Sequence, residues 1–315
     1  MAPRASVTAL QRHIRKRPWA LALAGYVVLG LLLLAPTIRP GHTLMPADIL
    51  RAVPPYNQVL THGPHNHAPS DAPLQFYPWM RFLRASLLHG DFPQWNPTVL
   101  GGVPTTPNGM VSSPYYPPML ALRWLDTSDV YNLFVLVHLV IGAIGVYAFA
   151  RVLGSRPMPA WVAGILAMVA GMWVHWSLHL LHLIAMVFLP LALACVHQAV
   201  VRPGPRQAAA LGAVVGMWWL GGNPQFVYYG TLTVAAYGLA LFVLHRRLGL
   251  LRPIASVAGG ALLGVMLAAP VLLPSLKLGP EILRQRESAD ALAASHLPPL
   301  DLVQLLLPTY RGDPV

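Results

Sequence analysis

The chain has 315 residues, of which 56% are hydrophobic and 10% are charged, and its mean hydropathy is +0.55. A soluble domain carries about 25% charged residues, so this composition excludes a soluble fold and a disordered chain. It indicates an integral membrane protein. The single cysteine excludes a disulfide framework and a cysteine-based zinc ribbon.

Seven apolar stretches predict membrane-spanning helices. Most approach the ~20 residues that cross a hydrocarbon core of ~30 Å, and the third and fifth are short. The first is long for a cleaved signal peptide and has no clear cleavage site after it, which favours a retained signal anchor. In chain order the stretches cover residues 19–38, 129–150, 158–174, 183–201, 207–222, 225–244 and 253–275.

The positions of the charges predict an orientation. The N-terminus and every second turn between spans hold 12 Lys and Arg and no acidic residue, whereas the opposite side holds 9 Lys and Arg with all 10 Asp and Glu. By the positive-inside rule the N-terminus is cytoplasmic. The net charge of +11 therefore marks topology and attracts lipid headgroups, and we expect no nucleic-acid partner.

The same rule predicts the domain organisation. A cytoplasmic arm over residues 1–18 precedes the first span, over 19–38. A large outer loop then covers 39–128, a bundle of six spans covers 129–275, and an outer tail covers 276–315.

The outer loop contains 15 of the 32 prolines, which predicts short helices and turns lying on the bundle. Residues 74–89 have the pattern of an amphipathic helix, on which Arg81 and Arg84 lie near one another. Aromatic and arginine side chains on a short helix are typical of a membrane interface. A second short helix is expected over 117–125.

Small residues and prolines predict how the spans pack. Two Gly-x-x-x-Gly motifs indicate close helix packing, and two prolines should kink the last span. No Asp, Glu, Lys or Arg lies in the middle of a span, which argues against an ion-coupled transporter and leaves His138 as the one opening for it. The motifs are Gly212 to Gly216 and Gly260 to Gly264, and the prolines are Pro270 and Pro274.

Two groups of three histidines are candidate metal ligands. One group lies in the outer loop, and the other has the i, i+4, i+7 spacing of one helical face. Zinc binding and an interfacial polar role both stay open for the second group, so no cofactor is assigned and a divalent metal is an alternative. The groups are His62, His65 and His67, and His175, His179 and His182.

Acid–base chemistry on the outer side must draw on the carboxylates there or on the outer histidines. Asp71 directly precedes the amphipathic helix, where it could serve as a catalytic base or cap the helix. Motifs for nucleotide binding, zinc proteases and serine hydrolases are absent from the sequence. The cytoplasmic side has no carboxylate to hold magnesium, which argues against an ATP-driven machine.

Several motifs taken together resemble a known family. They are Asp71-Ala-Pro-Leu-Gln75-Phe-Tyr77-Pro78-Trp79, Gly90-Asp-Phe-Pro93-Gln-Trp95-Asn96-Pro97, Gly101-Gly102-Val-Pro104 and Gly222-Asn223-Pro224-Gln225, with Arg286 in the stretch after the last span. The combination resembles the bacterial YfhO family of membrane proteins, which is similar to the GT-C glycosyltransferases.

The resemblance implies an all-α, GT-C-like bundle of about seven transmembrane helices in the bacterial plasma membrane. Such a protein would move a sugar from a polyprenyl-phosphate carrier to an envelope polymer or lipid acceptor on the outer face. Asp71 would be the catalytic base, and Asp48, in Met45-Pro-Ala-Asp48, would be a second candidate. The implied substrate-binding residues are Gln75, Tyr77, Arg81, Arg84, Trp95, Asn96, Asn223, Gln225 and Arg286.

A second function class stays open. Members of this family usually continue with further helices, so a fragment of a longer protein is one interpretation of this chain. The alternative function is a non-enzymatic transporter, flippase or envelope-assembly scaffold of the same fold.

Overall fold

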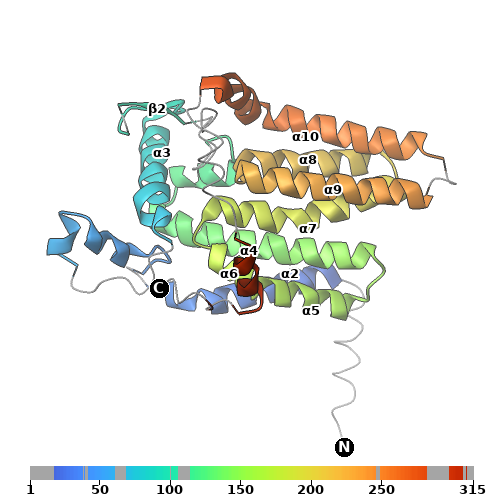
Figure 1. Cartoon of the computed structure of the whole chain (residues 1–315), viewed down its shortest axis with the longest axis horizontal. Coiled ribbons are helices and arrows are strands. Elements are labelled where there is room, and N and C mark those ends of the chain that lie inside the picture. Colours follow the sequence, from blue (N-terminus) through green and yellow to red (C-terminus); the bar gives the residue numbers. More distant parts are fainter. Residues whose placement is uncertain are drawn as a thin grey trace, which may run out of the picture.

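The computed structural model describes residues 18–37, 39, 42–60, 69–99, 101–105, 114–245, 249–281, 298–307 and 310, and most of these residues are helical. Long helices run side by side and form a bundle (Figure 1). They are α2 (Pro18–Leu33), α4 (Thr127–Val152), α5 (Pro157–Met168), α7 (Leu180–Val201), α8 (Pro205–Gly221), α9 (Pro224–His245) and α10 (Leu251–Leu278).

Short elements connect or follow these helices. Most lie between α2 and α4, where the dense prolines limit helix length. Two of them, β1 (Trp95–Asn96) and β2 (Val103–Pro104), pair antiparallel. The others are η1 (Ala35–Thr37), η2 (Ala47–Ala52), η3 (Tyr56–Gln58), η4 (Ala72–Phe76), α3 (Tyr77–His89), η5 (Pro117–Arg123), α6 (Gly171–Trp176), η7 (Gly279–Glu281) and η9 (Pro299–Leu305).

The helices are those of a membrane protein. Among the described residues, α4, α7, α9 and α10 are long and apolar enough to cross a membrane, whereas α2 and α5 are apolar but have only 16 and 12 residues. Large apolar side chains on the bundle surface are exposed, including Leu244 at 75% and Leu262 at 62%. A water-soluble protein rarely exposes so much contiguous apolar surface. The crossing of all seven predicted spans stays a prediction.

Two predicted spans have different ends in the structure. The stretch 158–174 is not one helix, because the backbone of Ala170 is extended (φ −62°, ψ 132°) and separates α5 from α6. The stretch 19–38 ends as an α-helix at Leu33, because Pro36 cannot continue the hydrogen-bond ladder. The other apolar stretches coincide with α4, α7, α8, α9 and α10 to within a few residues.

The core lies between α4 and α7, which pack against each other at the centre of the bundle (Figure 1). Helices α2 and α5 cover one side of α4, and α8 and α9 cover the other side of α7. Two hydrogen bonds from buried side chains cross this core: the Trp218 indole N–H donates to the carbonyl of Ala185 at 2.9 Å, and the Tyr131 hydroxyl donates to the carbonyl of Leu178 at 2.6 Å.

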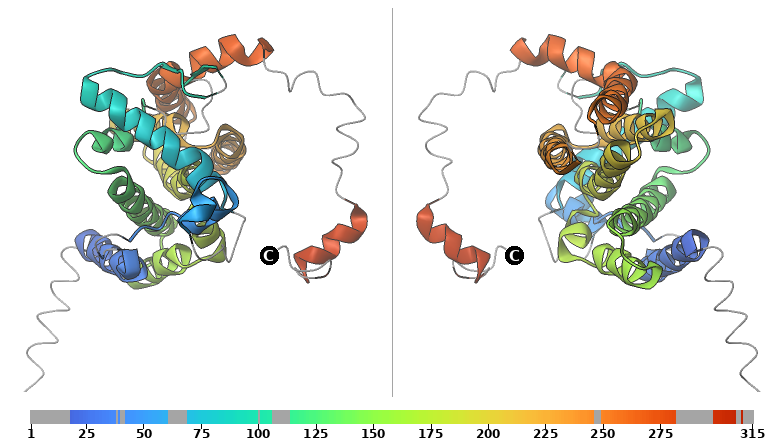
Figure 2. Two further views of the ribbon diagram at one scale, coloured as in Figure 1. Left: turned by 90° about the vertical axis from the view of Figure 1, so that its left-hand side faces the viewer. Right: turned by 90° about the vertical axis from the view of Figure 1, so that its right-hand side faces the viewer.

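The two Gly-x-x-x-Gly motifs pack against one another, which confirms the predicted close approach. A Cβ atom on Gly264 would lie 3.3 Å from the carbonyl oxygen of Gly212 and 2.7 Å from a Val215 methyl group. Helices α8 and α10 therefore form an extensive contact in which backbones nearly touch. Beyond this contact, α10 contains Pro270 and Pro274, and its last turns run in a different direction from the rest of the helix (Figure 2).

Helix α3 lies across one end of the bundle, which we call the α3 end (Figures 1 and 2). It is the predicted amphipathic helix, preceded by a π-helical turn in η4, and it buries Met80, Leu83 and Leu87. The Arg84 Nε donates to the carbonyl of Leu125 at 3.0 Å, and Arg123 Nη1 donates to that of Leu87 at 2.9 Å. These two bonds fasten α3 to η5, the second predicted short helix.

Candidate functional site

Asp71 opens the helical segment that leads into α3, and its side chain is exposed. Its backbone has helical angles (φ −62°, ψ −28°), and its carboxylate makes no capping hydrogen bond. A helix cap has a non-helical backbone and accepts a bond from the first turn. The capping interpretation of Asp71 is therefore wrong, and its oxygens are available for other contacts.

Two histidines from the start of α7 lie close to Asp71, and we call Asp71, His179 and His182 the histidine–carboxylate cluster. His179 immediately precedes α7 and is only 7% exposed. Burial lowers its pKa, the negative charge of Asp71 raises it, and the charge of His175 lowers it, with a net decrease. The lowered pKa favours the neutral imidazole, which can donate a hydrogen bond from one nitrogen and accept one at the other.

Aromatic rings hold the two histidines in place. The His182 ring stacks on Trp176 with centroids 4.4 Å apart and meets Phe226 edge-on at 4.9 Å. His179 meets Phe76 edge-on at 6.0 Å and His182 at 5.8 Å. Among the described residues, the Nδ1 atoms of both histidines are buried without a hydrogen-bond partner. Each histidine therefore has one nitrogen whose hydrogen-bonding capacity is unused in this structure.

The prediction that His175, His179 and His182 share one face of a helix is wrong. His175 belongs to α6, whereas His179 has a non-helical backbone (φ −102°, ψ 82°) between α6 and α7. The described part of the chain contains no group of three His, Cys, Asp or Glu residues that could hold a metal ion. The other predicted group, His62, His65 and His67, lies outside the described residues.

Asn223 brings a distant motif to the cluster. Its Nδ2 lies 3.4 Å from His182 Nε2, and its backbone N–H donates to the carbonyl of Leu181 at 3.0 Å. Its Oδ1 accepts the backbone N–H of Gln225 at 3.0 Å and so caps α9. The Gln225 side chain donates instead to the Tyr229 hydroxyl at 3.2 Å. Asn223 therefore joins the site, whereas Gln225 is engaged elsewhere.

Three further predicted site residues, Asp48, Gln75 and Tyr77, lie on segments that neighbour Asp71. Asp48 is half-buried in η2, which packs against η4, the turn that follows Asp71. Gln75 is exposed on η4, and Tyr77 is half-buried at the start of α3. The two candidate carboxylates thus come from neighbouring segments at the α3 end.

The arginine pair on α3 is not beside Asp71. Arg81 and Arg84 follow Asp71 by several helical turns, which places them about 15–20 Å away along the helix. Arg84 is bound to the carbonyl of Leu125, and its Nε lies 4.0 Å from Asp126 Oδ1. Burial would raise the pKa of the Asp126 carboxyl, but its hydrogen bond with Ser128 and the charge of Arg84 lower it. Arg84 is therefore engaged with Leu125 and Asp126, and the role of Arg81 and Arg84 in binding a phosphate stays a prediction.

The remaining predicted binding residues have structural roles or lie elsewhere. Asn96 is buried, and its Oδ1 accepts the N–H and the hydroxyl of Thr98 at 3.0 and 2.7 Å. Trp95 is 54% exposed and covers Gly102, where φ is 119° and a Cβ atom would collide with the indole. Arg286 lies outside the described residues.

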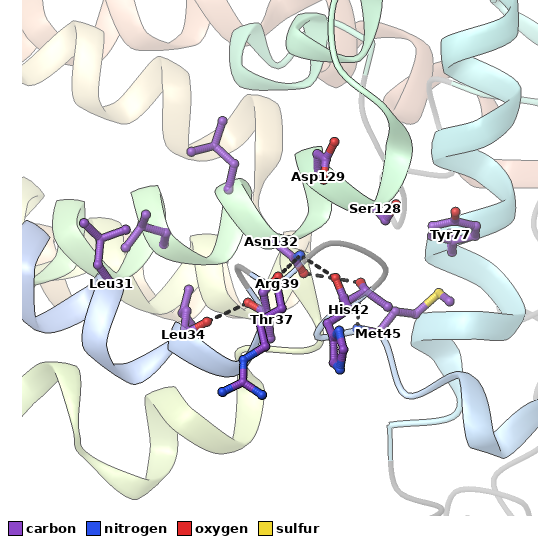
Figure 3. Close-up of a pocket in the computed structure, with 13 residues that line it drawn as sticks. Leu31, Leu34, Thr37, Arg39, His42, Met45, Tyr77, Ser128, Asp129 and Asn132 are labelled. Carbon is purple, nitrogen blue, oxygen red and sulfur yellow. Dashed lines mark hydrogen bonds between the residues drawn. The ribbon is translucent and has the colours of Figure 1, made fainter.

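A cleft of about 470 Å³ lies beside the first turn of α3. One wall is apolar and includes Leu31 and Leu136, and the rim is polar and includes Arg39, Asp129 and Tyr77. In Figure 3 the Arg39 and Asp129 side chains project to opposite sides, which separates a cationic from an anionic side of the cleft.

Asn132 holds this cleft together. Its Oδ1 accepts the backbone N–H of Leu44 at 2.8 Å and the hydroxyl of Thr43 at 3.3 Å, which ties the segment after α2 to α4 (Figure 3). Sequence reasoning did not single out Arg39 or Asp129. The available signal was their position, because Arg39 is the first charge after an apolar stretch and Asp129 lies in the first turn of α4.

Comparisons with protein-family models, with curated proteins and with solved structures found no match to this chain.

Proposed function

We propose that this membrane protein transfers a sugar from a polyprenyl-phosphate-linked donor to an envelope acceptor on the outer face of the membrane. The observation that carries the proposal is the convergence of two distant motifs at the α3 end. Asp71 and Asn223 come from separate parts of the sequence; Asp71 lies close to His179 and His182, and Asn223 contacts His182. Residues brought together in this way are typical of a site rather than of isolated surface positions.

The chemistry of transfer suits an exposed carboxylate at this position. An acceptor hydroxyl oxygen attacks the anomeric carbon, the bond from that carbon to the phosphate oxygen breaks, and the polyprenyl phosphate leaves with the bonding electrons. The proton of the hydroxyl passes to the Asp71 carboxylate, which acts as general base. His179 and His182, whose imidazoles lie within electrostatic reach of Asp71, are the candidate groups for binding the acceptor.

The cleft beside α3 suits the donor. Its apolar wall of Leu31, Leu34 and Leu136 matches an isoprenoid chain, and Arg39 at its rim offers a guanidinium for the phosphate. Tyr77 connects the cleft with the histidine–carboxylate cluster, because it lines the cleft and follows Asp71 on the same helical segment. Arg39 replaces Arg81 and Arg84 as the phosphate ligand in this proposal.

The test measures transfer from polyprenyl-phosphate sugars by the full chain in lipid nanodiscs. Arg39→Gln should raise the KM for the lipid-linked donor by about tenfold, because a charged hydrogen bond to phosphate is lost, with little change in kcat. Lys277→Gln is the matched control, since this exposed lysine lies at the end of α10 outside the cleft.

Two results would contradict the proposal. The cleft would lose its assigned role if Arg39→Gln and Lys277→Gln changed the KM equally. Folded wild-type protein that transfers no sugar from a panel of polyprenyl-phosphate donors would favour a non-enzymatic transporter, flippase or scaffold.

A further inference from the structure

A separate apolar cavity of about 300 Å³ lies at the end of the bundle opposite α3. It is formed where α2 and α5 begin and α4 approaches its end, and its lining includes Leu21, Tyr147, Met158 and Trp161. Figure 1 shows these helix ends together on the side away from α3. The cavity shares no residue with the cleft or with the histidine–carboxylate cluster.

The depth of this cavity matches the upper part of an acyl chain. Tyr147 lies five residues before the end of α4 at Val152, or about 7 Å along the axis, and Met158 is in the first turn of α5. Apolar groups of interfacial proteins lie about 5–10 Å into the boundary between headgroups and acyl chains. Met158 is 65% exposed and Leu21 is 40% exposed, so the cavity is open to surrounding lipid.

Three hydrogen-bond donors around the cavity have no partner among the described residues. They are the Tyr147 hydroxyl, Arg151 Nε and Trp161 Nε1, and all three are buried. The indole and the guanidinium can only donate, so this region has surplus donors and too few acceptors. Protein atoms cover these three donors, so the donors themselves do not form a ready contact for a ligand.

The charges near the cavity have one sign. Arg151 lies in the last turn of α4, where its Nη1 donates to the carbonyl of Ser155, and Arg156 is exposed immediately before α5. In the sequence, the basic residues of the N-terminal arm directly precede Pro18, which also lines the cavity. No acidic residue occurs in this arm or in the turn between α4 and α5. The complement of such a surface is an anionic headgroup.

We propose that this cavity binds an anionic glycerophospholipid, with one acyl chain against Leu21 and Met158 and the phosphate at Arg151 and Arg156. A phosphate supplies the negative charge that this basic region lacks. A zwitterionic lipid would bring its ammonium group to a basic surface and bind more weakly. The site goes beyond the proposed transferase function and does not depend on it.

Native mass spectrometry of the full chain tests this site with two probes, dioleoylphosphatidylglycerol and dioleoylphosphatidylcholine. The protein should retain the anionic lipid in preference to the zwitterionic one. Arg156→Gln should weaken binding of phosphatidylglycerol about fivefold, the typical effect of one arginine at an anionic surface. Arg206→Gln is the matched control, because Arg206 is equally exposed at the start of α8 and lines no part of this cavity.

A second variant tests the acyl-chain position. Met158→Trp fills the cavity mouth and should reduce lipid retention, while thermal unfolding confirms that the variant is folded. Equal effects of Arg156→Gln and Arg206→Gln would overturn the proposal, because they would show only a general attraction to basic surface. Equal retention of the two lipids, or unchanged retention by folded Met158→Trp, would overturn it as well.

Discussion

The hydroxyl of Tyr116 lies 2.6 Å from Nε2 of His138 in the interior of the protein, where neither side chain is exposed by more than 1%. His138 Nδ1 lies 2.6 Å from the carbonyl oxygen of Phe134. Since a carbonyl can only accept, Nδ1 carries the proton and Nε2 accepts the bond from Tyr116. His138 therefore has both nitrogens satisfied and fastens the segment before η5 to α4. It is a structural residue, and it offers no free nitrogen to a proton pathway.

Tyr116→Phe should destabilise the protein by about 1–3 kcal/mol, because it leaves Nε2 of His138 buried without a donor. Thermal unfolding in detergent measures the change. Tyr115→Phe is the matched control, since the half-buried Tyr115 contacts Phe92 through its ring. Equal loss of stability in the two variants would show that the Tyr116–His138 bond contributes nothing specific.

Gly264→Ala should lower the unfolding temperature, because the added methyl group would lie 2.7 Å from Val215 and force α8 and α10 apart. Overpacking of this kind costs about 1–3 kcal/mol. Gly259→Ala on the same helix is the control, since its methyl group would meet only Ala208 at 3.9 Å. The packing described for α8 and α10 would be refuted by two variants with the same unfolding temperature.

The neutral state of His179 should make stability depend on pH. The folded protein lowers the pKa of His179 below its ordinary value of 6.5, first through burial and further through His175, while Asp71 partly opposes the decrease. Between the folded and unfolded pKa values the unfolded chain binds more protons. Stability is therefore fully present above about pH 6.5 and is lost as the pH falls through the lowered pKa.

His179→Gln removes this titration, so its unfolding temperature should fall less between pH 7 and pH 5 than that of the wild-type protein. His89→Gln serves as the control, because His89 is exposed at the end of α3. An identical pH dependence in wild-type and His179→Gln proteins would show that burial of the neutral imidazole makes no contribution.

Sequence patterns predicted the helices and part of their packing. The apolar stretches located the bundle helices, and two Gly-x-x-x-Gly motifs indicated close helix packing, which the structure shows between α8 and α10. These features depend on local periodicity and residue size, which are visible in the sequence alone. The number of membrane crossings is harder to predict from the sequence, because α2 and α5 are shorter than a typical span.

The candidate site was predictable only in part. Its main carboxylate, Asp71, was identified from its position before a helix, but its neighbours depend on tertiary structure. Arg84 follows Asp71 closely in the sequence, but the helix carries Arg84 toward Leu125. The spacing of the histidines would place them on one face of a continuous helix, whereas His179 has a non-helical backbone before α7 and lies close to Asp71. Breaks of this kind arise from packing between distant segments, which local periodicity does not reveal.

The most direct test of the proposed function is the rate of sugar transfer by Asp71→Asn in nanodiscs, with Asp91→Asn as the matched control. Asparagine keeps the size of the side chain but cannot accept the proton, so kcat should fall by about 10²–10⁴ while the unfolding temperature stays unchanged. Asp91 is exposed just beyond the other end of α3, and Asp91→Asn should retain full activity. Transfer by Asp71→Asn within a few-fold of the wild-type rate would contradict the assignment of Asp71 as the base.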